Sequence, residues 1–200
     1  MGVWFVTGAS RGLGAEIVRE ALSRGHGVIA TARDAEAVLK AYPEKPAGLL
    51  AVTADVTSQE QMQAAVDAGL AEFGRIDVVV NNAGYGLVGA VEEVSDKAVR
   101  DLFDVNVFGV LNTLRATLPM LRAQGSGCVL NIGSVAGFAT APGTGLYGAT
   151  KVRPRGHFRS AVRRTGAPRC AGHHCRAGRL SHRFPRWRKP SSPARIHFGL

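Results

Sequence analysis

The amino-acid sequence predicts an α/β protein built on a doubly wound parallel sheet. Short apolar runs alternate with stretches of helical periodicity throughout residues 1–151, and a glycine-rich turn follows the first apolar run. Strands that alternate with helices form right-handed βαβ units, in which the strands run parallel and helices cover both faces of the sheet. Because the chain has 200 residues, of which 46% are hydrophobic, it is long enough to bury the core of one such domain.

Each element has its own local signal. Apolar runs predict five strands, at residues 3–6, 28–30, 49–52, 76–80 and 129–132. The first predicted helix carries apolar residues at helical spacing, beginning at Leu13, and ends at Gly25. Further helices are predicted at residues 34–41, 58–73 and 96–122, the last of them with a break near Val105.

Charge is distributed unevenly along the chain. Residues 1–151 hold 12 Lys and Arg and all 15 Asp and Glu, whereas residues 152–200 hold 13 Lys and Arg and no acid. An asymmetry of this kind is typical of an arm that binds nucleic acid or a membrane. No apolar run reaches the roughly 18 residues of a membrane span, and the N-terminus lacks the pattern of a secretory signal. Three Cys do not form a disulfide framework, so we expect a cytoplasmic protein.

The glycine-rich turn predicts a binding site for a dinucleotide. The segment Thr7-Gly8-Ala9-Ser10-Arg11-Gly12-Leu13-Gly14 lies between the first strand and the first helix. Such a turn lets the backbone approach a pyrophosphate, and the helix N-terminus offers free N–H groups and a partial positive charge. The residues predicted to contact the cofactor here are Gly8, Ser10, Arg11, Gly12, Leu13 and Gly14. The alternative is a glycine-rich turn that holds no ligand.

The end of the second strand predicts which dinucleotide binds. An acid at this position would hydrogen-bond the adenosine ribose and favour NAD, but the strand ends in Thr31-Ala32-Arg33. Arg33 and Arg11 could instead hold a 2′-phosphate, since a guanidinium binds phosphate through two hydrogen bonds. Asp34 follows one position late and is predicted to cap a helix. We therefore expect NADP(H), with NAD(H) as the alternative. If the two arginines have no function, they are simply solvated surface residues.

Tyr147 and Lys151 are the predicted catalytic pair. Carbonyl reduction needs a proton donor beside the atom that accepts the hydride, and a free Tyr has a pKa of about 10. Lys151 lies four residues further on, one helical turn away on the same face. A positive charge at about 4 Å is worth about 4 kcal/mol at an effective dielectric of about 20, so we expect Lys151 to lower the pKa of Tyr147 by roughly three units.

Taken in order, these motifs resemble those of the short-chain dehydrogenase/reductase family. The ordered set comprises the glycine-rich turn, Asn81-Asn82-Ala83-Gly84, Asn106, Ser134 and Tyr147-x-x-x-Lys151. The resemblance covers residues 1–151 and implies a Rossmann-like fold and hydride transfer between a nicotinamide cofactor and a carbonyl or alcohol carbon.

The resemblance also implies roles for individual residues. Ser134 would hydrogen-bond the substrate oxygen, Asn106 would kink the long helix and hold a proton-relay water, and Lys151 would also hold the nicotinamide ribose. Asp55 and Val56 would contact the adenine. The loop residues Asn82, Ala83 and Gly84 would approach the cofactor, whereas a buried Asn81 could equally tie strands together or touch the ligand. Family members often form homo-oligomers through the long helices.

The sequence after Lys151 departs from the family pattern. Relatives continue the catalytic helix, but here Pro154 follows, and proline breaks a helix in its interior. Codons read one base out of frame from Val152 onward permit an amphipathic helix, an apolar strand V-Q-V-T-I-V and a Glu-Pro-Gly turn, much as relatives have. We therefore expect an NADP-binding domain with the catalytic Ser, Tyr and Lys at residues 1–151. Residues 152–200 would be an irregular, out-of-frame basic tail, which leaves the C-terminal part of the fold truncated or scrambled.

Two other interpretations of the tail are weaker. Arg-rich segments bind phosphates, but shifted codons of GC-rich DNA also yield Arg, Pro, Ala and Gly, so nucleic-acid binding is not favoured. Cys170, His173, His174 and Cys175 could be metal ligands, but no second pair stands at zinc-finger spacing, so no metal site is predicted. We expect an NADP(H)-dependent oxidoreductase acting on a small carbonyl or alcohol, although the chain as written could be inactive. The alternative is an inactive nucleotide-binding domain with a basic tail that binds nucleic acid.

Overall fold

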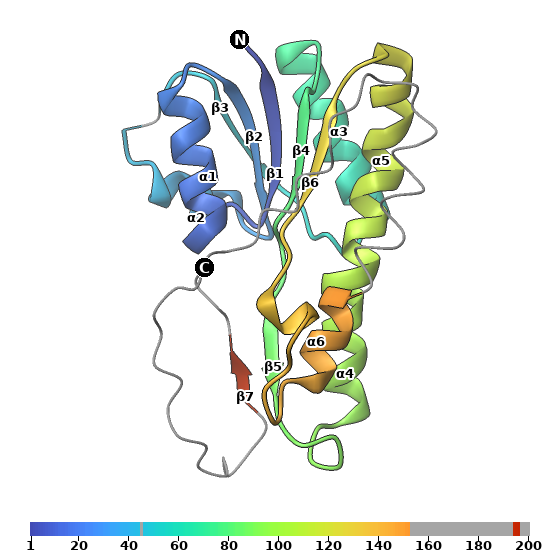
Figure 1. Cartoon of the computed structure of the whole chain (residues 1–200). Coiled ribbons are helices and arrows are strands. Elements are labelled where there is room, and N and C mark those ends of the chain that lie inside the picture. The colour runs from blue at the N-terminus through green and yellow to red at the C-terminus, as the bar shows by residue number, and fades with distance from the viewer. Residues whose placement is uncertain (45, 153–193, 197–200) are drawn as a thin grey trace.

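The computed structural model describes residues 1–44, 46–152 and 194–196. Its centre is a five-stranded, wholly parallel sheet with strand order β3-β2-β1-β4-β6 (Figure 1). The strands are β1 (Val3–Thr7), β2 (Gly27–Ala32), β3 (Leu49–Thr53), β4 (Val78–Asn81) and β6 (Cys128–Asn131). The predicted doubly wound, Rossmann-like α/β fold is confirmed, and all five predicted strands are present within two residues of their expected bounds.

Helices cover both faces of this sheet, as the hydrophobic content of the strands requires. In Figure 1, α1 (Gly12–Ser23) and α2 (Ala35–Ala41) lie on one side of the sheet, and α3 (Gln59–Phe73) and α5 (Gly109–Gln124) lie on the other. Successive residues of a strand point to opposite faces. Phe5 packs in the core beside α3 and α5, and its neighbour Val6 packs in the core beside α1. Strands buried on both faces explain why the sequence shows continuous apolar runs rather than alternation.

Polar side chains fix where several helices begin. The side chain of Asp34 accepts a hydrogen bond from the N–H of Glu36, Ser58 accepts one from Gln61, and Ser95 accepts one from Ala98. Each satisfies an N–H group that has no partner within its helix. The prediction that Asp34 caps a helix is therefore confirmed.

The long helix is interrupted where the sequence predicts a break. Helix α4 (Asp96–Phe103) passes into a π-helical turn at Asp104–Phe108, and α5 follows directly. π-helical turns inside α-helices are rare and often mark functional sites. This one contains Asn106, which is 2% exposed.

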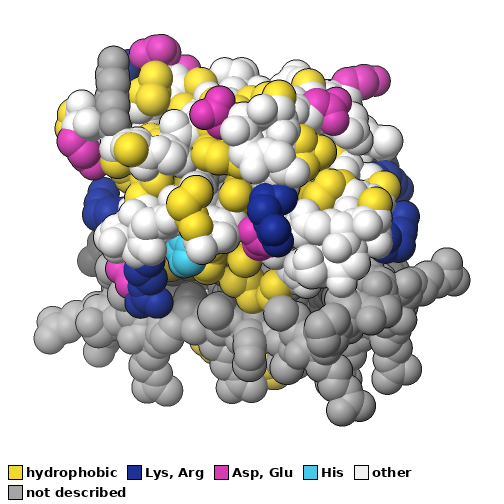
Figure 2. All heavy atoms as spheres, turned by 90° about the horizontal axis from the view of Figure 1, so that it is seen from above, with side chains coloured by type: hydrophobic (Ala, Val, Ile, Leu, Met, Phe, Trp, Pro, Cys, Tyr) yellow, Lys and Arg dark blue, Asp and Glu magenta, His cyan; other side chains and the backbone are white. Residues whose placement is uncertain are grey.

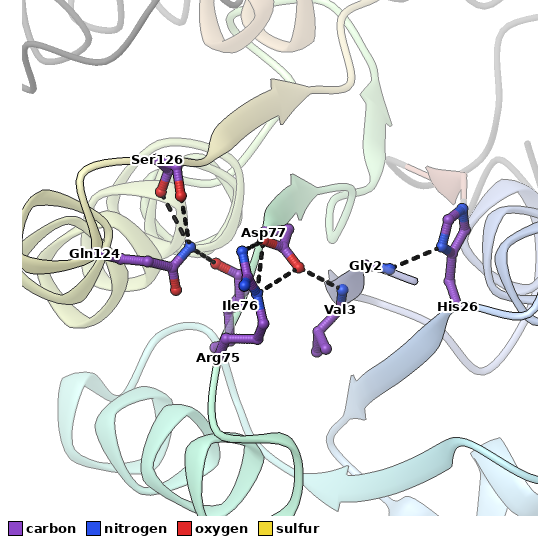
Figure 3. Close-up of polar contacts among 8 residues, drawn as sticks. All are labelled: Gly2, Val3, His26, Arg75, Ile76, Asp77, Gln124 and Ser126. Carbon is purple, nitrogen blue, oxygen red and sulfur yellow. Dashed lines mark hydrogen bonds and ion pairs between the residues drawn. The ribbon is translucent and has the colours of Figure 1, made fainter.

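Hydrogen bonds join the amino ends of the strands (Figure 3). The carboxylate of Asp77 accepts from the N–H of Val3 at 2.8 Å and from Nε of Arg75, so the segment before β4 is tied to the start of β1. Partial burial would raise the pKa of Asp77, but the bonds from Arg75 and Val3 outweigh it and hold that pKa below its usual value. Nδ1 of His26 accepts from the N–H of Gly2 at 3.2 Å, which anchors the start of β1 to the residue before β2.

The same end of the molecule carries mixed charges. Seen from above, the described part of this surface has Lys and Arg interspersed with Asp and Glu (Figure 2). Among the described residues, exposed ion pairs include Arg19 with Glu16 and Arg24 with Glu20. Such pairs contribute little stability, because both partners remain in water.

A second, smaller sheet was not predicted. It pairs β5 (Gly86–Val88) with β7 (Ala194–Ile196) in antiparallel orientation, and it lies below the main sheet in Figure 1, beside α6 (Gly145–Val152). Residues 194–196 thus form a short strand within the segment that was expected to be largely irregular, because the edge of β5 gives them backbone partners. The rest of that prediction, including the effect of Pro154, falls outside the described residues. None of the described helices is both long enough and apolar enough to span a bilayer.

Candidate functional site

A cavity of about 480 Å³ opens at the carboxyl ends of the parallel strands. The chain reverses its direction of winding between β1 and β4, and ligands of open α/β sheets bind at such a switch point. Its lining includes thirteen of the fourteen residues predicted to contact a cofactor, namely Gly8, Ser10, Arg11, Leu13, Gly14, Arg33, Asp55, Val56, Asn82, Ala83, Gly84, Tyr147 and Lys151. Gly12, Ser134 and Asn106 are not part of that lining.

The glycines of the turn are needed for two different reasons. Gly8 and Gly12 have φ angles of +68° and +56°, in the left-handed region that side chains disfavour. Gly14 has an ordinary φ, but a Cβ there would lie 2.2 Å from the carbonyl oxygen of Gly8 and 2.5 Å from Nδ2 of Asn82. The first residues of α1 can therefore pack directly on the loop that follows β4. Gly12 is outside the cavity lining, so its backbone conformation is the reason that the structure gives for a glycine at this position.

The N-terminus of α1 faces this cavity without a side-chain cap. Arg11 is the N-cap residue and forms no capping hydrogen bond through its side chain, while Ser10, Arg11, Leu13 and Gly14 line the cavity. Free N–H groups and the helix dipole favour an anion at such a position. The narrow glycine turn and the uncapped helix therefore fit the pyrophosphate of a dinucleotide.

Asn82 and Thr7 hold the two sides of the turn together. Nδ2 of Asn82 donates to the carbonyl oxygens of Thr7 at 2.9 Å and Gly8 at 3.1 Å. The hydroxyl of Thr7 accepts from the N–H groups of Asn82 and Ala83 at 3.0 and 3.1 Å, and it donates to the carbonyl oxygen of Val80. Thr7 was not among the predicted site residues. Its position before Gly8 was the available signal, but a Thr at a strand end is too common to identify a role.

Arg11 and Arg33 line the cavity, and neither forms an ion pair with any described residue. Asp34, the nearest acid in sequence, has its carboxylate engaged in capping α2 at 2.9 Å. Both arginines are exposed, and no described residue holds either guanidinium group in place. They are therefore free to bind an anionic group of a ligand.

Asp55 and Val56 form the wall beyond β3. Oδ1 of Asp55 accepts from the N–H and the hydroxyl of Thr57, at 2.9 and 2.8 Å, which closes a tight turn. The N–H of Asp55 donates to Oε1 of Gln61 at 2.8 Å. Asn112 on α5 donates from Nδ2 to the carbonyl oxygen of Val56 at 3.0 Å, so this wall is fixed from both sides.

Tyr147 and Lys151 lie together on α6. Nζ of Lys151 is 5.8 Å from the centroid of the Tyr147 ring and donates to the carbonyl oxygen of Ile132 at 3.4 Å. Tyr147 is 6% exposed. Ser134 lies just beyond β6, where its Oγ accepts from the N–H of Ala136 at 3.2 Å, and it also hydrogen-bonds Tyr147. The structure thus brings the predicted Ser, Tyr and Lys close together.

Burial governs the titration of this pair. It raises the pKa of Tyr147 above its usual value, and the hydrogen bond with Ser134 acts in the opposite direction without cancelling it. Burial also lowers the pKa of Lys151 from 10.5 to about 8. The expectation that Lys151 depresses the pKa of Tyr147 is therefore wrong for the protein alone. Loss of solvation favours the neutral form of both groups, so burial is the main cause of both pKa shifts.

Asn106 connects the π-helical turn to α6 rather than lining the cavity. Its Nδ2 donates to the carbonyl oxygen of Tyr85 at 2.9 Å and to Oγ1 of Thr150 at 3.1 Å, and its Oδ1 accepts from the N–H of Tyr85. Thr150 in turn donates to the carbonyl oxygen of Tyr147 at 2.7 Å. Thr150 is fully buried beside Lys151 and was missed, because its partners come from distant parts of the sequence.

Two further observations concern the predicted binding residues. Nδ2 of Asn81 donates to Oδ1 of Asn131 at 2.8 Å across β4 and β6, so of the two roles expected for Asn81 the structure shows the link between strands. Within the described ranges, no three His, Cys, Asp or Glu side chains gather as metal ligands would. Cys170, His173, His174 and Cys175 lie outside those ranges.

Comparison with known proteins identifies the family. The profile of the short chain dehydrogenase family matches residues 2–167. An oxidoreductase of Botryotinia fuckeliana is 42% identical over 153 residues, an alignment that covers 74% of this chain and 55% of the relative. A short-chain dehydrogenase structure from Streptomyces avermitilis has 41% identity and a TM-score of 0.74, and the match covers 83% of this chain and 62% of that one.

Other solved structures were determined with cofactors bound. A short chain dehydrogenase/reductase from Burkholderia phymatum in complex with NAD has 30% identity and a TM-score of 0.75, covering 80% of this chain and 58% of that one. An alcohol dehydrogenase from Thermococcus sibiricus complexed with 5-hydroxy-NADP has 31% identity and a TM-score of 0.77, covering 84% and 73%. The relatives therefore include proteins that bind either type of dinucleotide.

The chain belongs to the short-chain dehydrogenase family. It spans 55% of the length of the Botryotinia relative and 62% of the Streptomyces chain. The family resemblance inferred from the motifs of residues 1–151 is confirmed, and the family profile matches residues 2–167.

The lowered pKa of Lys151 predicts a specific pH dependence of stability. Because the folded-state pKa is about 8, below the ordinary 10.5, the folded state binds fewer protons between these values. The destabilising cost of burying the charge is then fully present below about pH 8 and is relieved as pH rises through the window to 10.5. We expect Lys151→Met to raise the free energy of unfolding at pH 7 by roughly 1–3 kcal/mol.

Urea unfolding between pH 7 and pH 10.5 measures this effect. The advantage of Lys151→Met should shrink steadily across the window, whereas Lys40→Met, at an exposed position on α2, should show no such trend. An advantage that stays constant with pH would contradict the assignment of the effect to the charge of Lys151.

Proposed function

We propose that the protein is an NADP(H)-dependent oxidoreductase that interconverts a carbonyl and an alcohol by hydride transfer. The observation that carries the proposal is the meeting of two independent sets of residues in one cavity. The glycine turn with the uncapped N-terminus of α1 forms one end, and Tyr147 with Lys151 forms the other. The first set fits a dinucleotide, and the second fits proton transfer to an oxygen beside it.

The roles of the side chains follow from their contacts. A nicotinamide dinucleotide, when bound, supplies or accepts the hydride. Tyr147 donates its phenolic proton to the carbonyl oxygen during reduction, and takes a proton back during oxidation. Ser134 hydrogen-bonds Tyr147 in the protein alone, and in this proposal its hydroxyl turns to donate to the substrate oxygen when substrate binds. With a pKa of about 8, Lys151 is mostly protonated at pH 7 and stabilises the tyrosinate that proton transfer leaves behind.

Asn106 acts through other groups in this proposal. All of its side-chain hydrogen bonds go to Tyr85 and Thr150. Thr150 holds the backbone of Tyr147, so Asn106 positions the phenol through α6. The family resemblance implies that Asn106 holds a relay water. For that role, the side-chain carbonyl or the backbone of Asn106 would have to face the water.

The preference for NADP(H) over NAD(H) rests on Arg11 and Arg33. Both line the cavity without an acidic partner, and Asp34 is committed to capping α2. A 2′-phosphate could bridge two guanidinium groups, while no carboxylate stands at the end of β2 to bind a ribose 2′-hydroxyl. The protein is further proposed to be cytoplasmic, to act on a small carbonyl or alcohol, and to form a homo-oligomer.

The cofactor preference can be tested by changing one charge. In a protein made from a gene with the frame restored, Arg33→Asp should weaken NADPH binding by more than it weakens NADH binding, because only NADPH carries the 2′-phosphate. Arg122→Asp makes the same change of charge on α5, away from the cavity lining, and should leave the ratio of the two affinities unaltered. Equal losses for both cofactors on Arg33→Asp would show that Arg33 does not bind the phosphate.

The proton donor can be tested in the same frame-restored protein. Tyr147→Phe keeps the ring but removes the transferable proton, so turnover should fall by about 10²–10⁴-fold or more while NADPH binding stays nearly unchanged. Tyr85→Phe removes a hydroxyl from the other tyrosine in the cavity lining and should cause a much smaller loss. Turnover of Tyr147→Phe within about tenfold of the parent would rule out Tyr147 as the acid.

The tail is proposed to arise from a shifted reading frame. The support is the absence of acid in residues 152–200 together with the alternative frame, which yields a helix, a strand and a Glu-Pro-Gly turn. On this proposal the NADP-binding domain comprises residues 1–151, and the 200-residue chain itself has negligible reductase activity.

Sequencing the genomic DNA across codons 145–200 tests the frame directly. We expect one base more or fewer than the written sequence requires, with the family-like alternative downstream. An intact frame would favour the second candidate function, an inactive nucleotide-binding domain whose tail of 13 basic residues binds nucleic acid. Salt-sensitive binding to DNA without cofactor-dependent turnover is the behaviour that distinguishes this candidate.

A further inference from the structure

The small sheet lies at the catalytic end of the molecule and joins the C-terminal segment to it. β5 begins directly after Tyr85, a residue of the cavity lining, and β7 pairs with its outer edge in the register Gly86 to Ile196, Leu87 to Arg195 and Val88 to Ala194 (Figure 1). No other strand takes part in this sheet among the described residues. An isolated pair of strands this short is marginal in water, so it depends on packing against something else.

That packing is against the helix that carries Tyr147. Leu87, at the centre of β5, is 1% exposed and lies in a small core cluster with Val94, Leu102 and Tyr147. This cluster is separate from the two cores that flank the main sheet. The side chain of Leu87 therefore joins the β5–β7 pair to the core cluster that contains Tyr147.

The backbone of β5 is fixed at both ends as well. Tyr85, just before it, exchanges two hydrogen bonds with the side chain of Asn106, and Gly89, just after it, donates to the carbonyl oxygen of Gly143 at 2.9 Å. The same Asn106 holds Thr150 on α6. β5 is thus linked to α6 through a shared core cluster and through the hydrogen bonds of Asn106.

We propose that β7 acts as a strand latch: its docking on the edge of β5 and the ordering of the Leu87–Tyr147 cluster stabilise each other. The partner of the edge is this chain's own residues 194–196, bound by main-chain hydrogen bonds in the manner of an added strand. Coupling of this kind is reciprocal, so a docked β7 orders α6 and an ordered α6 favours docking. The proposal concerns the 200-residue chain, and a frame-restored protein would need a different segment to fill this edge.

The register offers a direct test in the full chain. Residues directly opposite each other in an antiparallel pair have Cα atoms about 4.5–5.5 Å apart, within the range that a disulfide spans. We would combine Val88→Cys with Ala194→Cys, after changing Cys128, Cys170 and Cys175 to serine. The matched control combines Val88→Cys with Arg195→Cys, because a shift of one residue turns the second side chain to the opposite face.

Two readouts decide the outcome, and neither uses cofactor or turnover, so they do not depend on the proposed function. In a glutathione buffer the Val88–Ala194 pair should form its disulfide in clearly higher yield than the control pair. Hydrogen exchange of the amides in residues 145–152 should then be slower in the oxidised than in the reduced form of the same protein, by up to about fivefold. Equal disulfide yields would overturn the docking of β7, and equal exchange in both redox forms would overturn its coupling to α6.

Discussion

The hydroxyl of Thr7 and the side-chain amide of Asn82 hold together the two strand ends between which the candidate site opens. β1 and β4 are paired neighbours in the sheet, but the chain leaves them in opposite directions beyond Val6 and Val80. Thr7 accepts two N–H groups from the loop after β4, and Asn82 returns two hydrogen bonds to the turn after β1. Buried backbone groups are costly when unpaired, so these side chains satisfy a need that the switch point itself creates.

The close approach of α1 depends on the same link. Asn82 occupies space that a Cβ at Gly14 would need, and Gly8 lies against the backbone of Ala83. With glycine at both positions, the first turn of α1 packs against the loop, and its free N–H groups are directed at the cavity. The end of the cavity that is proposed to bind an anion is thus a consequence of packing between two loops.

The catalytic end is organised by burial rather than by attraction between charges. Tyr147 and Lys151 are both removed from water, and burial shifts the pKa of each toward its neutral form, upward for the phenol and downward for the ammonium group. The helix that carries them is held from three directions: by Asn106 through Thr150, by the carbonyl oxygen of Ile132, and by the cluster around Leu87. Such support keeps a phenol in place beside a cavity, as acid–base chemistry requires.

The sequence by itself determined the five parallel strands, the helices between them, the break at the π-helical turn and most residues of the cavity lining. These follow from local patterns: apolar runs, helical spacing, an Asp at a helix start, and motifs whose spacing the backbone geometry demands. The pKa shifts of Tyr147 and Lys151, the role of Thr150 and the pairing of β5 with β7 were decided only by tertiary structure. Desolvation depends on every atom that excludes water from a group, and strand pairing across more than one hundred residues depends on which edge is left open. Neither the desolvation of a group nor the pairing of a strand is encoded in the residues that lie near it in the sequence.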